Sequence, residues 1–410
     1  MKCVILPIAK TIRKEVIMGL NQTIHGLAKL LDRDIIDTYH SRRVAYIALL
    51  IAESVGFDPN ACRLVALAAL LHDAALTQRE RKNENYRMIV HKEYEALREH
   101  ALKSQKIARY LNMHLDICNG IGLHHTPAEQ NHSIIGNLLF LADNIEASYR
   151  AIDNPFAFDE LYAFLAQSNE LFDKRLLNAF KEISKIHAFW YSLQPVFVDN
   201  TLKDLLQRLP DEVTSEEMKK RIAYLIAYIF DSKSPYLDSY SVIAKNIAVV
   251  LGYKLSLDME ALKLAALLSH TGYAYIAEEI LNKPGVLNTT QINSIKAHPF
   301  YTKSILEELG YSKRVIQAAV YHHERPNASG YPYRIELTDI HCQVVAASTL
   351  LAALLQNRPY RKAFKEHEAV EITNRCRWDS GIKKALSELD IQAVISNKDD
   401  YYEGVRRLFL

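Results

Sequence analysis

Residues that can bind metal ions stand where the N-terminal half of the sequence predicts buried surface. Residues 61–76 (ACRLVALAALLHDAAL) are apolar on almost every side, which predicts a central buried helix, yet they contain His72 and Asp73. His40 and His100 also lie on predicted apolar helix stripes. A single histidine in such a position is more often a hydrogen-bonded core residue than a ligand, so no one of these residues decides the chemistry.

As a group, the inward-facing residues favour a metal centre. The candidate ligands are His40, His72, Asp73, His100, His124, His125 and Asp143. Burying them without partners would cost on the order of several kcal/mol per charge, whereas a divalent cation satisfies them all at once. Nitrogen and oxygen donors suit iron, manganese, zinc or nickel, and more than four ligands favour two ions, with a carboxylate such as Asp73 as the bridge. Two such ions are suited to the hydrolysis of a phosphoester.

Length and composition predict two ordinary globular domains. The chain has 410 residues, of which 49% are apolar and 24% charged, and this length exceeds what one core usually organises. Its 50 Lys+Arg against 48 Asp+Glu are too balanced for a surface that follows duplex nucleic acid. The five cysteines form no CxxC pair, which predicts reduced thiols and a cytoplasmic location. The apolar stretch at 4–8 is too short for a signal peptide or a membrane span, so we expect no membrane association.

The second half of the sequence repeats the first, which predicts that the helices that position the candidate ligands occur twice along the chain. Helical periodicity dominates and alternating patterns are scarce, which predicts an all-α fold. The stretch ALAALLHDAAL around His72 corresponds to KLAALLSHTGY around His270, and the segment around His100 corresponds to that around His298. Chance similarity between unrelated helices would not preserve both the order of these segments and the distance between them along the chain. An internal duplication is therefore the economical explanation.

The duplication also predicts where the chain divides. Gly56 in VGF, which should end a helix in the left-handed conformation, is matched with Gly252 in LGY. Polar residues, Pro210 and acidic pairs cluster near 199–217. We therefore predict two tandem domains, a catalytic metal-binding one at 1–210 and a second one at 211–410.

The first copy resembles the HD superfamily of metal-dependent phosphohydrolases, whose signature is H…HD…D. His72–Asp73 is that doublet, and His100 with the pair His124–His125 resembles the extended ligand set of the HD-GYP subgroup, bacterial phosphodiesterases that cleave cyclic dinucleotides such as cyclic di-GMP. The likeness covers residues 38–146. It implies that all seven candidates bind two divalent ions, iron or manganese ahead of nickel or zinc, with Asp73 as the bridge. It also implies a hydroxide held by both ions as the attacking group, with His72, Asp73 and His100 as catalytic residues.

The second copy carries the subgroup's other motif but resembles a degenerate member. HHERPNASGYP at 322–332 contains the HHE and GYP segments. The metal positions are altered: Tyr236 stands in the place of His40, Ser269–His270 replaces the His–Asp doublet, and Thr349 or Ser348 replaces Asp143. Without either carboxylate a two-metal centre lacks its bridge, so we expect this HD-GYP-like domain to be non-catalytic. It could instead form a homodimer or bind a signalling protein.

The first copy also departs from the subgroup, which leaves the substrate open. Leu76 replaces the usual lysine and the GYP stretch is absent. The alternatives are a phosphohydrolase of another nucleotide or phosphoester, and a signalling adaptor with a vestigial metal site. We expect at least one of three basic residues that follow the doublet to contact substrate phosphate, namely Arg79, Arg81 or Arg87.

Two further pairs of residues lie close to candidate ligands in the sequence. Arg42 and Arg43 are interpreted as surface charges unless they face the cleft. Asn144 and Glu146 are expected to support the ligands from outside the metal shell.

Overall fold

The described residues form helices and turns. A computed structural model describes residues 18–32, 39–75, 94–151, 161, 169–397 and 399–409. Within these ranges only three isolated β-bridges interrupt the helical pattern, so the predicted all-α class is confirmed. No described helix is both long enough and apolar enough to cross a lipid bilayer. The four described cysteines are free thiols.

The first half is a helical lobe built around α3. Its elements are α1 (Leu20–Leu31), α2 (His40–Ser54), α3 (Pro59–Leu71), α5 (Tyr94–Tyr110), α6 (Leu115–Gly122), η3 (Ala128–Gln130), α7 (Ile134–Ala151), η4 (Asn169–Leu171), α9 (Lys174–Ile183), α10 (His187–Tyr191) and α11 (Val198–Arg208). Asp58 caps α3 by accepting from the amide of Ala61, and Pro59 occupies the first turn. Helices α1, α2, α6 and α7 pack around α3, as its apolar sequence predicts.

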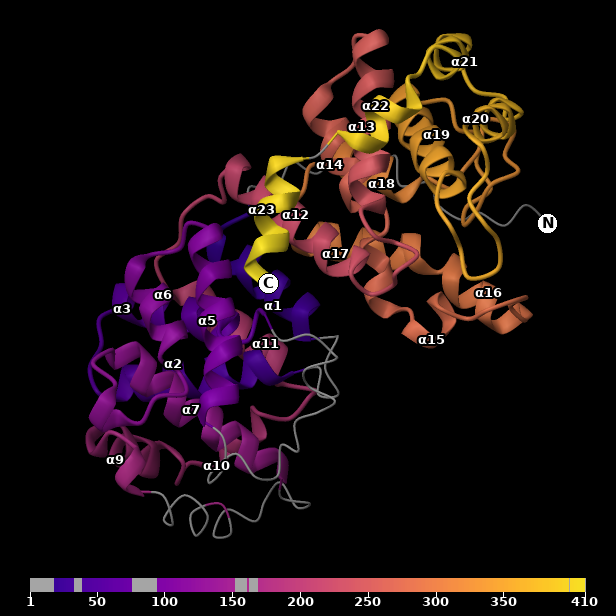
Figure 1. Ribbon diagram of the computed structural model, residues 1–410. Coiled ribbons are helices and arrows are strands. Elements are labelled where there is room, and N and C mark those ends of the chain that lie inside the picture. Colours follow the sequence, from indigo (N-terminus) through magenta and orange to yellow (C-terminus); the bar gives the residue numbers. More distant parts are fainter. Residues whose placement is uncertain are drawn as a thin grey trace, which may run out of the picture.

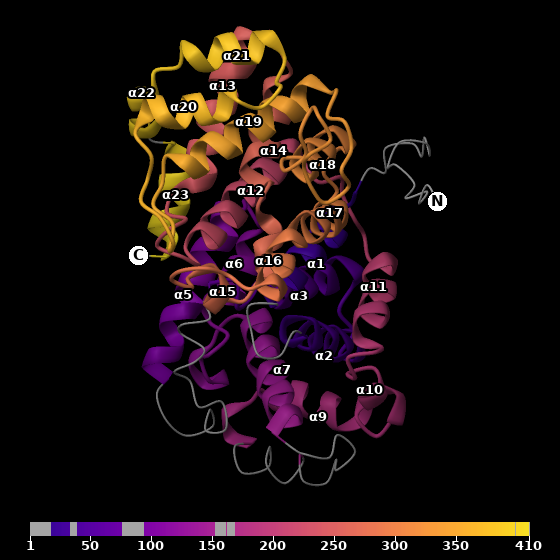
Figure 2. The same ribbon diagram turned by 90° about the vertical axis from the view of Figure 1, so that its right-hand side faces the viewer.

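The second half forms another helical lobe (Figures 1 and 2). Its elements are α12 (Glu216–Asp231), α13 (Tyr240–Lys254), α14 (Met259–Leu268), η5 (Thr271–Tyr275), α15 (Glu278–Leu281), α16 (Thr289–Lys296), α17 (His298–Glu308), α18 (Lys313–Val320), α19 (Ile340–Leu354), α20 (Glu366–Asn374), α21 (Ser380–Ser387), α22 (Ile391–Ser396) and α23 (Asp400–Phe409). Helix α14 is packed by α12, α13, α18 and α19, so it takes the central place that α3 has in the first lobe.

The two lobes touch through helices from opposite ends of the chain. Helix α1 packs on α17, where the Lys29 ammonium lies 2.9 Å from the Glu308 carboxylate. The last helix, α23, returns to lie against α12 and α5 (Figure 1). Helix α11 packs with α1 and α2, whereas α12 packs within the second lobe. The division at residue 210 falls between these two helices and stays a prediction.

The structure corrects the predicted register of the duplication at α2 and α13. Gly56 follows α2 with φ = 85°, but Gly252 lies inside α13, and Ser256 takes the left-handed position after that helix with φ = 55°. The matching residue for His40, the first residue of α2, is therefore Tyr240, the first residue of α13, rather than Tyr236. The register changes because α14 has 10 residues and α3 has 13, so the second copy has lost most of a helical turn.

Candidate metal centre

The seven candidate ligands come from five places in the first lobe and lie together. His40 begins α2, His100 lies on α5 and Asp143 lies on α7. His72 and Asp73 occupy the turn that ends α3, not the interior of that helix as the sequence suggested. The histidine pair follows α6 in a turn. All seven are buried, with exposed fractions between 0 and 6%.

The carboxylate of Asp73 lies at the centre of the cluster. Its Oδ1 atom is 3.5 Å from Nε2 of His72, 3.4 Å from Nε2 of His100 and 3.6 Å from Nε2 of His124. Its Oδ2 atom is 3.2 Å from Nε2 of His40. One carboxylate therefore faces two groups of imidazoles through its two oxygens, which is the arrangement that a bridging ligand needs.

Backbone carbonyls select the ring nitrogen that is left to bind a ligand. Nδ1 of His72 donates to the carbonyl of Ala69 at 2.7 Å, and Nδ1 of His124 donates to that of Ile121 at 2.6 Å. Both rings therefore turn Nε2, and not Nδ1, toward the cavity. Nε2 of His124 is buried and has no hydrogen-bond partner. A buried lone pair without a donor fits a metal ligand.

His40 is oriented by Glu146, which lies one turn after Asp143 on α7. Nδ1 of His40 donates to the Glu146 carboxylate at 2.7 Å, so Nε2 again faces the cavity, 3.4 Å from Asp143. Burial by itself would lower the pKa of His40, but Glu146, with Asp73 and Asp143, raises it to about 10. Burial likewise opposes ionisation of Glu146, and His40 and Arg150 overcome it, so that the pKa of Glu146 is about 2. The expected supporting role of Glu146 agrees with this contact.

Asn144 does not support the ligands in this way. Its side-chain amide donates to the carbonyl of Phe140 on its own helix. Only one of the two residues expected to hold the ligands from outside therefore contacts them.

The cluster combines imidazoles whose pKa is lowered with a carboxylate whose pKa is also lowered. Burial lowers the pKa of His72 to about 3 and keeps the pKa of His125 well below its ordinary value. Burial opposes ionisation of Asp73 too, but the surrounding histidines hold its pKa well below the usual range. Nε2 of His125 lies 2.8 Å from Nε2 of His100. The neutral imidazoles of His72 and His125 and the ionised Asp73 are in the protonation states that bind divalent metals, whereas His40, with its raised pKa, has to lose a proton when a metal binds.

Arg42 and Arg43 are buried, so their interpretation as surface charges is wrong. Arg43 donates to the carbonyl of Leu193 at 2.8 Å and pairs with Glu146 at 3.2 Å. Arg42 pairs with Asp199 at 2.8 Å. These partners lie more than a hundred positions away, and local periodicity therefore could not identify them.

The three arginines expected to contact substrate phosphate lie outside the described residues, as does Leu76. Arg79, Arg81 and Arg87 consequently remain predictions.

In the second lobe, four histidines lie together, and one of them is the histidine of the altered doublet. His270, His298, His322 and His323 bring ligand atoms within 4.8 Å of one another. His270 stands at the position of Asp73. The altered doublet thus replaces a carboxylate with a fourth imidazole rather than only removing a ligand.

Comparison with known proteins gives matches to two family models, both described as HD domain, one at residues 38–148 and the other at residues 207–379. The 3′3′-cGAMP-specific phosphodiesterase 1 of Vibrio cholerae is 25% identical over 426 aligned positions, which cover 96% of this chain and 95% of that protein. The cyclic di-GMP phosphodiesterase response regulator RpfG of Xanthomonas campestris is 32% identical over 159 positions, covering 37% of this chain and 41% of that protein. A crystal structure of a cyclic GMP-AMP specific phosphodiesterase of V. cholerae, V-cGAP3, matches with a TM-score of 0.62 at 18% identity and covers 94% of this chain and 99% of that one. This last likeness concerns the fold.

Proposed function

Since the chain belongs to the HD family of metal-dependent phosphohydrolases and carries two HD domains in tandem, we propose that its first domain is a phosphodiesterase that hydrolyses a cyclic dinucleotide. The observation that supports this most strongly is the position of Asp73, whose two oxygens face His40 on one side and His72, His100 and His124 on the other. Such a centre suits two divalent ions, iron or manganese ahead of nickel or zinc.

We propose that all seven clustered residues bind these ions. When bound, the pair of ions would activate water and neutralise charge on the phosphodiester. The protein's own contribution is orientation: the carbonyls of Ala69 and Ile121 and the carboxylate of Glu146 hold three imidazoles with Nε2 facing inward. Burial of the cluster excludes bulk water, which strengthens each electrostatic contact with a phosphate.

The substrate proposal rests on the relatives. The V. cholerae enzyme that matches almost the whole chain is specific for 3′3′-cGAMP, whereas the cyclic di-GMP enzyme RpfG matches 41% of its own length. We therefore place 3′3′-cGAMP ahead of cyclic di-GMP, which the motifs alone suggested. A linear nucleotide or another phosphoester is the competing substrate class.

The second domain, which we place at 211–410, is proposed to be non-catalytic. Its four-histidine cluster includes no carboxylate among the described residues, so it lacks the bridging oxygen that the first cluster has. Its use in a homodimer or with a signalling protein stays a prediction.

The test is hydrolysis by the full chain loaded anaerobically with Fe²⁺ or Mn²⁺. We expect turnover of 3′3′-cGAMP or cyclic di-GMP, and its loss in the double variant His72→Ala with Asp73→Ala. His132→Ala is the matched control because His132 is an exposed histidine of the same lobe. No turnover of any cyclic dinucleotide with either metal, while linear nucleotides are hydrolysed, would replace this substrate class. No turnover of any phosphoester would favour a signalling adaptor.

A further inference from the structure

Four histidines of the second lobe form a compact cluster beside a large cavity. His270 follows α14, His298 begins α17, and His322 and His323 follow α18. Three of them have exposed fractions of 8% or less, and His323 is partly exposed toward the cavity. Their ligand atoms lie within 4.8 Å of one another.

The ring nitrogens of His298 and His322 face each other in a way that hydrogen bonding cannot explain. Nδ1 of His298 donates to the carbonyl of Ile295 at 2.7 Å, and Nδ1 of His322 donates to that of Ala319 at 2.6 Å. Both Nε2 atoms are then unprotonated, yet they lie 3.0 Å apart. Two lone pairs at this distance repel unless a cation lies between them. The separation fits neighbouring nitrogen ligands of one ion, each about 2.0–2.1 Å from it.

The other two histidines, His270 and His323, also have an Nε2 atom that hydrogen bonding leaves available for a metal ion. The hydroxyl of Ser269 donates to the carbonyl of Ala266, so it accepts from Nδ1 of His270 at 3.0 Å and leaves Nε2 of that ring unprotonated. Nε2 of His323 is buried and has no hydrogen-bond partner. Protonation would not satisfy these rings, because a buried imidazolium needs a nearby carboxylate and this cluster contains none among the described residues.

The GYP segment places an aromatic ring on the cluster. A Cβ on Gly330 would lie 2.4 Å from the carbonyl oxygen of His323, so only glycine lets this segment approach so closely. Tyr331 stacks on His323 with 4.4 Å between ring centroids. The buried Glu324 holds the segment by accepting from the amide of Tyr333 at 2.7 Å.

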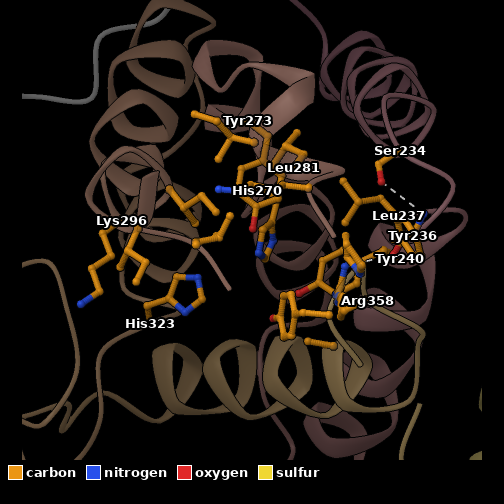
Figure 3. Close-up of a pocket in the computed structure, with 18 of the residues that line it drawn as sticks. Ser234, Tyr236, Leu237, Tyr240, His270, Tyr273, Leu281, Lys296, His323 and Arg358 are labelled. Carbon is orange, nitrogen blue, oxygen red and sulfur yellow. Dashed lines mark hydrogen bonds between the residues drawn. The ribbon is translucent and has the colours of Figure 1, made fainter. Parts of the chain in front are cut away.

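The cavity beside the cluster has a volume of about 620 Å³ and combines an apolar lining with cationic side chains. Four cationic side chains line it: Lys283, Lys296, Arg325 and Arg358. Five tyrosines also line it, and the described lining includes no Asp or Glu. Figure 3 shows His270 and His323 at the cavity, with Tyr240 and Arg358 on the side opposite His323. The Arg358 guanidinium lies 5.1 Å from the centre of the Tyr240 ring.

We propose that the second lobe binds one transition-metal ion through His270, His298, His322 and His323, and that the ion and the cavity together bind a phosphate-bearing nucleotide. Four neutral imidazoles leave the double charge of the ion uncompensated, and the cationic lining adds to it, so an anionic ligand is favoured. The tyrosines supply faces on which a base can stack. This site does not depend on hydrolysis by the first lobe.

Metal content tests the first part of this proposal. The His72→Ala, Asp73→Ala variant of the full chain, stripped and then titrated with Co²⁺, should keep one tightly bound ion per chain. Adding His298→Ala and His322→Ala should remove it, and His341→Ala should not, since His341 lies outside the cluster. If the four-substitution variant does not fold, His323→Gln should still weaken Co²⁺ binding at least tenfold. A first-lobe variant that binds no ion, or unchanged binding after the second-lobe substitutions, would overturn the site.

Ligand binding is measured with the same Co²⁺-loaded His72→Ala, Asp73→Ala variant. The part of the visible Co²⁺ absorption that His298→Ala with His322→Ala removes reports on the second lobe. Addition of GMP or 3′3′-cGAMP should change that part, and Arg358→Gln should weaken that response at least tenfold. Inorganic phosphate should bind more weakly, since it has no base to stack. If neither nucleotide changes the spectrum, the proposed nucleotide binding is wrong. This result does not depend on whether the first lobe hydrolyses a phosphoester.

Discussion

The Nδ1 hydrogen of His40 is donated to Glu146, 2.7 Å away, and the same carboxylate accepts from Arg150 at 2.8 Å. One buried carboxylate thus fixes the direction in which the first imidazole of the centre points. Such outer contacts fix the tautomer and orientation of a ligand and thereby tune its affinity for the metal.

We therefore expect Glu146→Gln to lower metal affinity about 10–100-fold while the protein stays folded. The amide can still accept from His40, but it no longer balances the charge of the two arginines. Competition with a chromophoric chelator measures the affinity. Glu182→Gln, which removes an exposed carboxylate paired with Lys185, is the control. Equal affinities in both variants would contradict a positioning role.

Removal of metal should lower the thermal midpoint of the full chain. A ligand that binds only the folded state stabilises it by about 2.7 kcal/mol at 100 times its Kd. Midpoints measured by calorimetry before and after chelation should differ by several degrees and return on addition of Mn²⁺. In the His72→Ala, Asp73→Ala variant the difference should shrink. If chelation leaves the wild-type midpoint unchanged, the buried histidines are not occupied by metal in solution.

Asp231 predicts a pH dependence that is unrelated to the metal centres. Burial raises the pKa of Asp231 to about 7, although Ser241 and Tyr402 donate hydrogen bonds to it. The folded state then retains a proton that the unfolded chain releases near the ordinary pKa of 3.8. Stability from this group is present below about pH 4 and is lost as the pH rises to about 7.

Asp231→Asn should remove that loss, because an amide can donate to Ser241 and accept from Tyr402 without a charge. Relative to wild type, the variant should gain on the order of 1 kcal/mol or more between pH 5 and pH 8. Urea unfolding at several pH values measures it. Asp204→Asn, at an exposed position of α11, should show no such trend. A constant difference across the pH range would rule out a protonated Asp231.

The corrected register gives a matched pair of substitutions. Ser256 and Gly56 both follow their helices with positive φ, and the space around a Cβ at Gly56 is open. Ser256→Gly should raise the free energy of unfolding by about 0.5–1 kcal/mol, whereas Gly56→Ser should lower it by about 1 kcal/mol. Chemical denaturation measures both. If Ser256→Gly instead lowers the free energy of unfolding, or Gly56→Ser raises it, the two left-handed turns are not equivalent.

Gly330→Ala should disrupt the second lobe. Its methyl group would meet the backbone of His323 and Glu324, which cannot move aside cheaply. We expect a lower thermal midpoint and loss of the Co²⁺ signal assigned to the second lobe. Gly404→Ala, on α23 with nothing within 4 Å of the added carbon, should be neutral or slightly stabilising. Retained Co²⁺ binding in the Gly330 variant would separate the GYP segment from the histidine cluster.

The sequence by itself determined the all-α class, the duplication and the identity of the seven candidate ligands. Apolar residues at helical spacing decide which face of each helix is buried, and a polar residue on that face is visible without coordinates. His40, His100 and Asp143 could be found for this reason. The HHE and GYP letters likewise identified the second copy.

Only the tertiary structure decided which atoms meet. It places Asp73 between two groups of imidazoles, turns His270 into the fourth member of a second cluster, and pairs Arg43 with Leu193 and Glu146. These contacts depend on how helices distant in the sequence pack, and on the three residues by which α14 is shorter than α3. Periodicity reports which way a side chain faces, but not what faces it from another helix.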